Sequence, residues 1–457
     1  MTSKKATPSP AVLAGAEIEL TFDDLLSNGQ AVGRAGGMAV FVFGPLPGER
    51  ARVRIVAVKP KYAVGEAIEL LDASDERAEP FCPVFGTCGG CQVQHLSYPA
   101  QLAWKRDIVR SALQRIGGIA DAQVSPTIGM LDPRRYRNKM SLVAERSAAG
   151  FGFYKQRSHD IVPIEHCPIV QAPLDDYIGR LIRLRRDGDT AGALANVRHV
   201  VARTARASQE SILTLTTAEP SKAAERAADV LLSSLPGAVG ITNSFDLSSE
   251  NAILGRKHKV LAGRAQIEEV IAGIRFRISA TSFFQVNVEI VERLFDFMRP
   301  RIGPARRIVD LYCGSGTFAL FFAKAGSHVL GVEESQAAVR EAHANATLNG
   351  LADRALFRCG RVAQALQQPQ CARALGGADL VFLDPPRKGS DPQTLAAIAG
   401  ANVPNVWYLS CDPATLARDL KFLMPKGYDL PTVQPFDMFP QTGHVESLAM
   451  LARRENR

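Results

Sequence analysis

The N-terminal part of the chain alternates short runs of strand-forming residues with turns rich in glycine and proline. The runs fall at residues 16–22, 38–42, 50–59 and 64–70. Four or five strands in so short a stretch predict a small β-barrel over residues 11–72. Such barrels often present a basic face to nucleic acid, and this one has Arg50, Arg52, Arg54, Lys59 and Lys61. A solvated strand face is an equally good interpretation of these charges.

The middle of the chain contains both helix-like and strand-like patterns of apolar residues. Apolar residues at helical spacing predict a helix over 98–116, within a segment 96–118 that could pack on the C-terminal domain, and two glycines would end it. Strand patterns follow at 140–145, 197–204 and 211–217, with a helix near 222–234. We therefore expect a mixed α/β domain over residues 73–273.

The last part of the chain alternates strands with helices. Strand-like runs stand at 307–312, 329–333, 380–384 and 405–410, with helical stretches between them. This order predicts a doubly wound, Rossmann-like α/β sheet over residues 274–457.

A glycine-rich turn follows the first of these strands. Gly314 and Gly316 would let the backbone approach a ligand closely, and Glu333, at the end of the next strand, could accept hydrogen bonds from two ribose hydroxyls. The pattern fits either NAD or S-adenosylmethionine. Asp384 stands in an Asp-Pro-Pro sequence at the end of a later strand and would point into the same crevice. Nicotinamide-binding folds have no standard use for this Asp-Pro-Pro sequence, which favours S-adenosylmethionine.

Two residues near the C-terminus are candidates for catalysis. Cys411 ends a strand, with Asp412 as a plausible N-cap and Pro413 as the first helical residue, so the helix dipole and free amides should favour its thiolate. Glu446 enters a final apolar strand, where desolvation would raise its pKa and suit it to take a proton. His444 is the rival base.

Four of the eight cysteines could hold a metal centre. Cys82, Cys88 and Cys91 are clustered, and Cys167 lies 75 residues further on. This spacing favours an iron-sulfur cluster over structural zinc, and unrelated cysteines are the third possibility. His95 and His166 are possible substitute ligands.

Composition narrows the class of protein. The 457 residues suffice for several domains, and 46% hydrophobic with 22% charged residues exclude wholesale disorder. Lys and Arg exceed Asp and Glu by 54 to 46, which favours an anionic partner such as RNA. No apolar run is long enough for a membrane helix and no signal peptide is apparent, so we expect a cytoplasmic protein, and a monomer.

Taken together, these features resemble the iron-sulfur type of RNA uracil-5 methyltransferase that modifies 23S ribosomal RNA. The sequences SFFQVN, DLYCGSGTF, GVE, LDPPR, SCDPATLARD and FPQTGHVES occur in the family's order, and the resemblance covers nearly the whole chain. It implies a class I methyltransferase domain, an N-terminal OB-like TRAM barrel and a central domain with a [4Fe-4S] cluster on Cys82, Cys88, Cys91 and Cys167.

The resemblance also implies roles for single residues. S-adenosylmethionine would be contacted by Gln285, Tyr312, Glu333 and Asp384, beside the loop at Gly314. Cys411 would be the nucleophile that adds to carbon 6 of uracil, and Glu446 would remove the proton from carbon 5 after methylation.

The target is 23S rRNA on this interpretation, with departures from the family at Thr317, Asp412 and residues 136–140 that leave the exact uridine open. Methylation of uracil 54 in tRNA is the alternative that uses the same catalytic residues. A non-catalytic iron-sulfur RNA-binding protein and a radical methylthiotransferase are further readings. Intact Cys411 and Glu446 oppose the first, and the cysteine spacing opposes the second.

Overall fold

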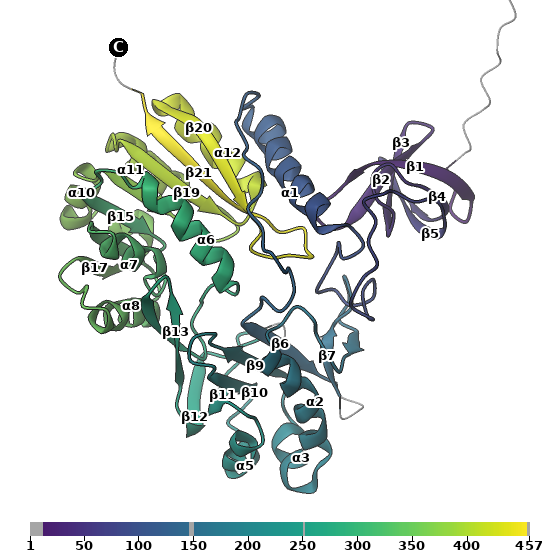
Figure 1. Cartoon of the computed structure of the whole chain (residues 1–457), viewed down its shortest axis with the longest axis horizontal. Helices are drawn as coiled ribbons and strands as arrows, with labels where there is room; N and C mark the ends of the chain where they lie inside the picture. Colours follow the sequence, from purple (N-terminus) through teal and green to yellow (C-terminus); the bar gives the residue numbers. More distant parts are fainter. Residues whose placement is uncertain (1–11, 146–149, 250–251, 455–457) are drawn as a thin grey trace, which may run out of the picture. The chain divides into compact units, whose positions relative to one another are not determined.

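The computed structural model describes residues 12–145, 150–249 and 252–454 (Figure 1). The chain divides into two compact units. The first contains the residues up to Trp104 together with Gln441–His444, and the second contains Lys105–Pro440 and the residues from Val445 onward. The division between them falls inside one helix, α1 (Tyr98–Ala112).

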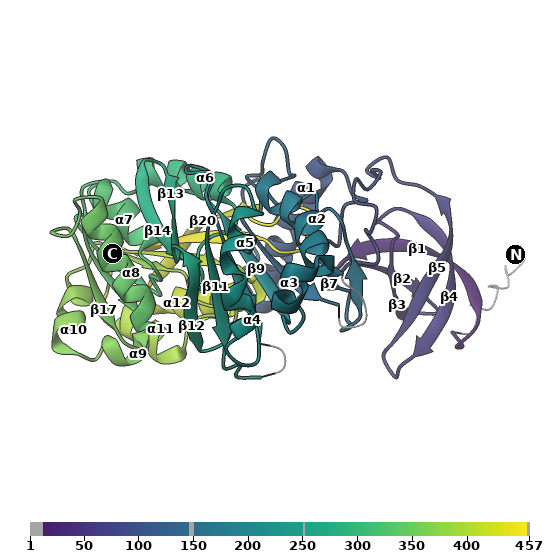
Figure 2. The ribbon, with the colours of Figure 1, turned by 90° about the horizontal axis from the view of Figure 1, so that it is seen from below.

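The first unit contains the expected β-barrel, which is closed by five strands in the order β1-β2-β3-β5-β4 (Figure 2). The strands are β1 (Glu17–Leu25), β2 (Gln30–Ala35), β3 (Met38–Phe43), β4 (Arg50–Val58) and β5 (Tyr62–Asp72). Alternate side chains point inward, so that Val40, Val42 and Val53 are fully buried. The barrel prediction is confirmed, with β2 as the strand that no run had indicated.

The arginines of β4 do not form the free basic face that their sequence suggested. Arg50 pairs with Glu19 and Asp72, while Arg52 and Arg54 each pair with one carboxylate of a neighbouring strand, Glu69 and Glu17 respectively. The cross-strand register places acids opposite these bases. For these three residues the ion pairs favour the solvated strand face, one of the two interpretations of the sequence, because the compensating acids come from other strands.

The second unit begins with a mixed sheet of seven strands in the order β12-β11-β10-β9-β6-β7-β8. Its strands are β6 (Lys139–Ala144), β7 (Phe151–Tyr154), β8 (Ile161–Pro163), β9 (His199–Thr204), β10 (Ser211–Thr216), β11 (Ala238–Phe245) and β12 (Lys257–Gly263). The accompanying helices are α2 (Ala172–Arg186), α3 (Gly188–Leu194), α4 (Lys222–Arg226) and α5 (Ala228–Ser233). The single helix expected near 222–234 is thus two, since Ala227, at φ −96° and ψ 4°, leaves the helical conformation.

A hairpin and a helix lead into the C-terminal sheet. The hairpin pairs β13 (Gln266–Ile271) with β14 (Ile274–Ser279), and helix α6 (Val288–Met298) follows it. Asn287 caps this helix, because its side-chain oxygen accepts the Ile290 N–H at 3.3 Å.

The C-terminal sheet has the order β17-β16-β15-β18-β19-β21-β20, in which only β21 runs opposite to the other strands. Its strands are β15 (Arg307–Leu311), β16 (His328–Glu333), β17 (Ala355–Cys359), β18 (Leu380–Leu383), β19 (Asn405–Ser410), β20 (Tyr428–Phe436) and β21 (Glu446–Arg453). The helices between them are α7 (Thr317–Lys324), α8 (Gln336–Leu348), α9 (Val362–Ala365), α10 (Pro369–Gly376), α11 (Pro392–Gly400) and α12 (Pro413–Leu423).

Both faces of this sheet are covered, as a doubly wound fold requires. Ile308 and Phe382 pack into a cluster with α6, α7 and α8, whereas their neighbours Val309 and Leu383 pack into a second cluster with α11 and α12. The second cluster also takes up Val109 of α1. Helix α1 continues as a π-helical turn, Leu113–Gly117, which ends at left-handed Gly118. The prediction of a helix that stops at two glycines is confirmed.

Candidate active site

Five of the predicted site residues lie at one edge of the C-terminal sheet. Tyr312 follows β15, Glu333 is the last residue of β16, Asp384 follows β18 and Cys411 follows β19. These strands are parallel, so their carboxyl ends share an edge, and antiparallel β21 brings its first residue, Glu446, to the same edge. In open α/β sheets this edge is where ligands bind.

The strand register sets Cys411 opposite Glu446. Ser410 of β19 pairs with Ser447 of β21, and Cys411 and Glu446 are the next residues outward along the two strands. Glu446 is buried, at 6% exposure, and its charge acts directly on the thiol. The candidate nucleophile Cys411 and the candidate base Glu446 therefore lie next to each other, whereas the side chain of the rival base His444 is exposed.

The glycine loop is bound to the acidic residue of the next strand. Gly314 has a φ of 53°, and its N–H donates to the Glu333 carboxylate at 3.1 Å. The Ser335 N–H donates to the other oxygen of that carboxylate at 2.8 Å. Gly316 has a φ of 88° and a Cβ there would lie 3.2 Å from Phe357, so the turn requires glycine. Glu333 is fixed in orientation and keeps lone pairs for a ligand.

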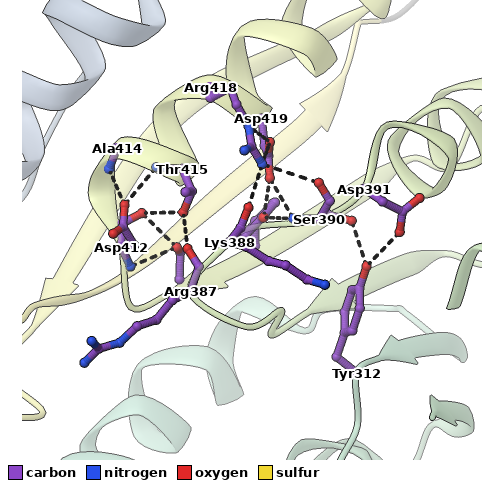
Figure 3. Close-up of polar contacts among 12 residues, drawn as sticks. Tyr312, Arg387, Lys388, Ser390, Asp391, Asp412, Ala414, Thr415, Arg418 and Asp419 are labelled. Carbon is purple, nitrogen blue, oxygen red and sulfur yellow. Dashed lines mark hydrogen bonds and ion pairs between the residues drawn. The ribbon is translucent and has the colours of Figure 1, made fainter. Parts of the chain in front are cut away.

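Tyr312 links this loop to the segment after Asp384. Its backbone is left-handed, at φ 66°, and its hydroxyl lies 3.0 Å from the Ser390 hydroxyl and donates to Asp391 at 3.4 Å (Figure 3). Asp391 in turn caps α11 by accepting the Thr394 N–H at 2.9 Å. The phenol group is thereby occupied, which leaves the ring of Tyr312 as the part able to contact a ligand.

The start of α12 does not activate Cys411 as expected. Asp412 is the N-cap and Pro413 the first helical residue, as predicted, but the Asp412 carboxylate accepts both the Ala414 and the Thr415 N–H at 2.9 Å (Figure 3). Burial, followed by the nearby carboxylates of Glu446 and Asp384, raises the pKa of Cys411 to about 12. The expectation of a favoured thiolate was wrong, because the amides donate to the Asp412 carboxylate and the thiol lies near the carboxyl groups of Glu446 and Asp384.

The carboxyl groups of the site have raised pKa values. Burial raises the pKa of Glu446 to about 8, with a further contribution from Asp384, and raises the pKa of half-buried Asp384 to about 7. Asp310 on β15 is fully buried and its pKa lies well above the ordinary value, again because of burial first and Asp384 second. The direction predicted for Glu446 is confirmed. The positive charge of Arg387 acts in the opposite direction and lowers the pKa of both Glu446 and Cys411.

A buried carboxylate that the motif search missed holds the site loops together. Asp419 of α12 is 2% exposed and accepts a hydrogen bond from the Ser390 N–H at 2.9 Å (Figure 3). It also accepts a hydrogen bond from the Tyr408 hydroxyl at 2.6 Å. Arg418 donates to its other oxygen at 2.8 Å. The sequence held a usable signal, since Asp419 lies three residues after buried Leu416 on the apolar face of its helix.

Gln285 lies in the segment that precedes α6. This residue is 8% exposed, and its backbone carbonyl oxygen accepts a hydrogen bond from the side-chain amide of Asn138 at 3.1 Å. Asn287 donates to the Met438 carbonyl, in the loop before β21, at 3.3 Å. Phe283, two residues before Gln285, is 75% exposed.

The four cysteines proposed as cluster ligands are all half-buried. In the first unit burial raises the pKa of Cys88, with a smaller contribution from Cys82, and the Gly90 N–H donates to the Cys88 sulfur at 3.5 Å. In the second unit the Cys167 N–H donates to Asp175 at 2.6 Å. Across residues 12–145, 150–249 and 252–454, no three His, Cys, Asp or Glu side chains are grouped closely enough to hold a metal ion.

The two candidate substitute ligands differ. His95 is 4% exposed, and burial lowers its pKa to about 4, so it is neutral near pH 7. His166 is exposed and lies 3.4 Å from Asp175. Among the helices of the described part of the chain, none is long and apolar enough to cross a membrane.

A doubly wound sheet with a glycine loop, a ribose-type acid and further acids at its carboxyl edge is typical of enzymes that bind an adenosine cofactor, and the comparisons show that this enzyme is an S-adenosylmethionine-dependent methyltransferase. A family model described as tRNA (uracil-5-)-methyltransferase matches residues 98–454, and a TRAM domain model matches residues 11–68. The chain belongs to the tRNA (uracil-5-)-methyltransferase family and carries an N-terminal TRAM domain.

Individual relatives agree with this assignment. The chain is 39% identical over 444 residues to an uncharacterized RNA methyltransferase of Halalkalibacterium halodurans, covering 95% of this chain and 96% of the relative. It is also 39% identical over 446 residues to an uncharacterized RNA methyltransferase of Thermosynechococcus vestitus, covering 96% and 98%. The solved tRNA (uracil-54, C5)-methyltransferase of Pyrococcus abyssi, in complex with S-adenosyl-L-homocysteine, is similar with a TM-score of 0.75 and 25% identity, covering 95% of this chain and all of that one.

Proposed function

We propose that this enzyme transfers a methyl group from S-adenosylmethionine to carbon 5 of a uridine in 23S rRNA through a covalent adduct with Cys411. The observation that carries the proposal is the register that sets Cys411 opposite buried Glu446, beside the glycine loop. Carbon 5 of uracil is a weak nucleophile, so an enzyme needs a nucleophile and a base at the same place.

Methyl transfer takes three steps. The Cys411 thiol gives up its proton to solvent, the resulting thiolate bonds to carbon 6, and the electron pair of the carbon 5–carbon 6 double bond shifts toward carbon 4, which leaves a negative charge on the carbonyl oxygen there. S-adenosylmethionine supplies the electrophilic methyl group, which carbon 5 takes. Glu446, ionised once the methyl donor has bound, then accepts the proton of carbon 5, the double bond re-forms, and the carbon–sulfur bond breaks to return the Cys411 thiolate.

The remaining predicted site residues would hold the methyl donor. Glu333 would bind the ribose hydroxyls, and the backbone at Gly314 would allow close approach of the ligand. Tyr312 would offer its ring, while Asp384 and Gln285 would contact the polar groups of the ligand. The network on Asp419 supports these roles, since it holds the Asp384 segment and the Cys411 helix in one arrangement.

The raised pKa values lead to a prediction about the methyl donor. At pH 7.5 Glu446 is mostly protonated and Asp384 partly so, given pKa values of about 8 and about 7. A cationic sulfonium nearby lowers both values, so binding of S-adenosylmethionine should release protons. The release should be largest around pH 7 to 8 and vanish above about pH 9, where both groups are already ionised.

Calorimetry in buffers of different ionisation enthalpy measures this release. S-adenosylhomocysteine is the matched control, because its sulfur is neutral, and it should release fewer protons. Glu446→Gln should remove part of the release seen with S-adenosylmethionine. Equal release by both ligands would show that these acids do not face the sulfonium.

We also propose that Cys82, Cys88, Cys91 and Cys167 hold a [4Fe-4S] cluster. The four thiols are the right donor type, and the closeness of Cys82 to Cys88 supports part of the set. Protein purified without oxygen should be brown and contain about four irons and four sulfides per chain. Cys88→Ser should lose the colour, whereas exposed Cys359→Ser should keep it. One zinc per chain and no visible absorption would contradict the proposal.

The substrate RNA decides between the two family activities. Methylation of uracil 54 in tRNA is the second candidate, favoured by the likeness to the Pyrococcus abyssi enzyme. Incubating the purified protein with methyl-labelled S-adenosylmethionine and unmodified transcripts of 23S rRNA and tRNA, followed by mass spectrometry of digested RNA, tests both. We expect 5-methyluridine in the rRNA. Label in tRNA alone would reject the rRNA assignment, and no label in either would reject both activities.

We further propose that the enzyme acts as a monomer with functional domains over residues 11–72, 73–273 and 274–457.

A further inference from the structure

The barrel carries a second cationic region apart from the paired arginines of β4. Lys59 and Lys61 flank Pro60 in the tight turn between β4 and β5, where the Lys59 N–H donates to the Tyr62 carbonyl at 2.8 Å. Both lysines are exposed. Within the described part of the chain neither forms an ion pair, in contrast to Arg50, Arg52 and Arg54.

Aromatic and apolar side chains lie next to these lysines on the outer surface. The rings of Phe41 and Tyr62 meet edge to face, with centroids 5.4 Å apart, and Tyr62 is 39% exposed. Val58, at 40% exposure, is the last residue of β4 before the turn. An aromatic pair left open to water beside unpaired cations gives little stability to the barrel itself and is suited to a partner.

The strand register adds a third cation to this surface. Arg34 of β2 is opposite Ala39 of β3, and Ala39 is opposite Tyr62 of β5, so the two outward side chains share one row across the barrel wall. Arg34 is exposed, and its guanidinium donates only a long bond, 3.4 Å, to the Gly37 carbonyl. We call the surface formed by Arg34, Phe41, Val58, Lys59, Lys61 and Tyr62 the hairpin face.

We propose that the hairpin face binds an unpaired stretch of the RNA substrate, with a base against the Phe41–Tyr62 pair and phosphates at the lysines and Arg34. The proposal rests on the proposed function, because it names the surface by which that substrate is held. Bases stack on exposed aromatic rings in a positively charged groove whatever their sequence. A protein partner fits less well, since lysine is depleted at the centres of protein interfaces.

The test compares the hairpin face with the arginine row of β4 in the full-length protein. The probe is a labelled oligouridylate of about 20 nucleotides, longer than the site of one such barrel, with a duplex RNA of equal length beside it. The variants are Tyr62→Ala, Tyr62→Phe and the double change Lys59→Gln/Lys61→Gln. The matched control is Arg52→Gln/Arg54→Gln, which also removes two positive charges, but from arginines of β4 that form ion pairs.

Tyr62→Ala should weaken oligouridylate binding by about 5-fold or more, the loss typical of one stacked base, and Tyr62→Phe should bind like the wild type. The double lysine variant should lower the slope of log affinity against log salt by about 1.4, because two phosphate contacts are lost. The arginine control should change affinity much less, and duplex binding should respond little to Tyr62→Ala. Unchanged melting temperatures would show that the barrel is intact.

Equal weakening by the lysine and arginine variants, or unchanged binding by Tyr62→Ala, would overturn the proposal and leave a protein partner as the occupant to seek. Methyl transfer by the wild type is measured separately. If no RNA is methylated while oligouridylate binding still depends on Tyr62, the proposed function fails and the RNA surface stands. If methylation proceeds and Tyr62 has no effect on binding, the surface assignment alone fails.

Discussion

Glu446→Gln should accumulate a denaturant-stable complex of protein and RNA, whereas Cys411→Ala should form none. Glutamine keeps the nucleophile and the methyl donor site but cannot take the carbon 5 proton, so the methylated adduct cannot release its cysteine. Alanine removes the sulfur that bonds to carbon 6. Methyl transfer by Cys411→Ala should fall by roughly 10⁴- to 10⁶-fold, the loss typical when a nucleophile is removed.

Electrophoresis under denaturing conditions with labelled RNA measures the complex. The double variant Cys411→Ala/Glu446→Gln should show no complex, and Cys359→Ala, which removes an exposed cysteine at the end of β17, should behave like the wild type. A complex that persisted in the double variant would move the nucleophile to another residue. Normal turnover by Glu446→Gln would return His444 as the candidate base.

The second large effect should be on stability, at the ion pair between Lys105 and Asp437. Both side chains are fully buried, the ammonium lies 2.5 Å from the carboxylate, and it donates a further bond to the Phe439 carbonyl at 2.9 Å. Burial lowers the pKa of Lys105, and Asp437 opposes that shift. Asp437→Ala would leave a buried ammonium without its counter-charge, which typically costs about 3 to 5 kcal/mol.

Urea unfolding followed by circular dichroism should show this loss as a lower midpoint. The double variant Lys105→Met/Asp437→Leu should recover most of it, because no unpaired charge remains. The exposed pair between Arg180 and Asp176 is the control, and Asp176→Ala should change the unfolding free energy by less than about 1 kcal/mol. Similar losses at both pairs would mean that burial does not determine the cost.

The sequence predicted those parts of the fold that depend on neighbours along the chain. The barrel strands, the helix that stops at Gly118 and the parallel strands of the C-terminal sheet all follow local periodicity and turn residues. The glycine loop and its acid were also visible, because both lie at the ends of predicted strands.

The features that sequence reasoning missed or mistook depend on residues distant in the chain. The thiolate expected at Cys411 depended on free amides, but Asp412 occupies them and Glu446 reaches the thiol only through the pairing of β19 with β21. The arginines of β4 lose their free charge to carboxylates on β1 and β5. Periodicity cannot report such partners, since register between strands is a property of the folded chain.

The segment just before Glu446 has a consequence for how the protein can be divided. Gln441–His444 belong to the first unit, where the side chains of Gln441 and Gln101 join at 3.0 Å and the Gln92 N–H donates to the Gln441 carbonyl at 2.9 Å. The chain therefore passes from one unit to the other at three places instead of one. A truncated or transplanted second unit would lose the fold that holds the four residues Gln441–His444 close before Glu446, so no single cut in the chain separates the two units.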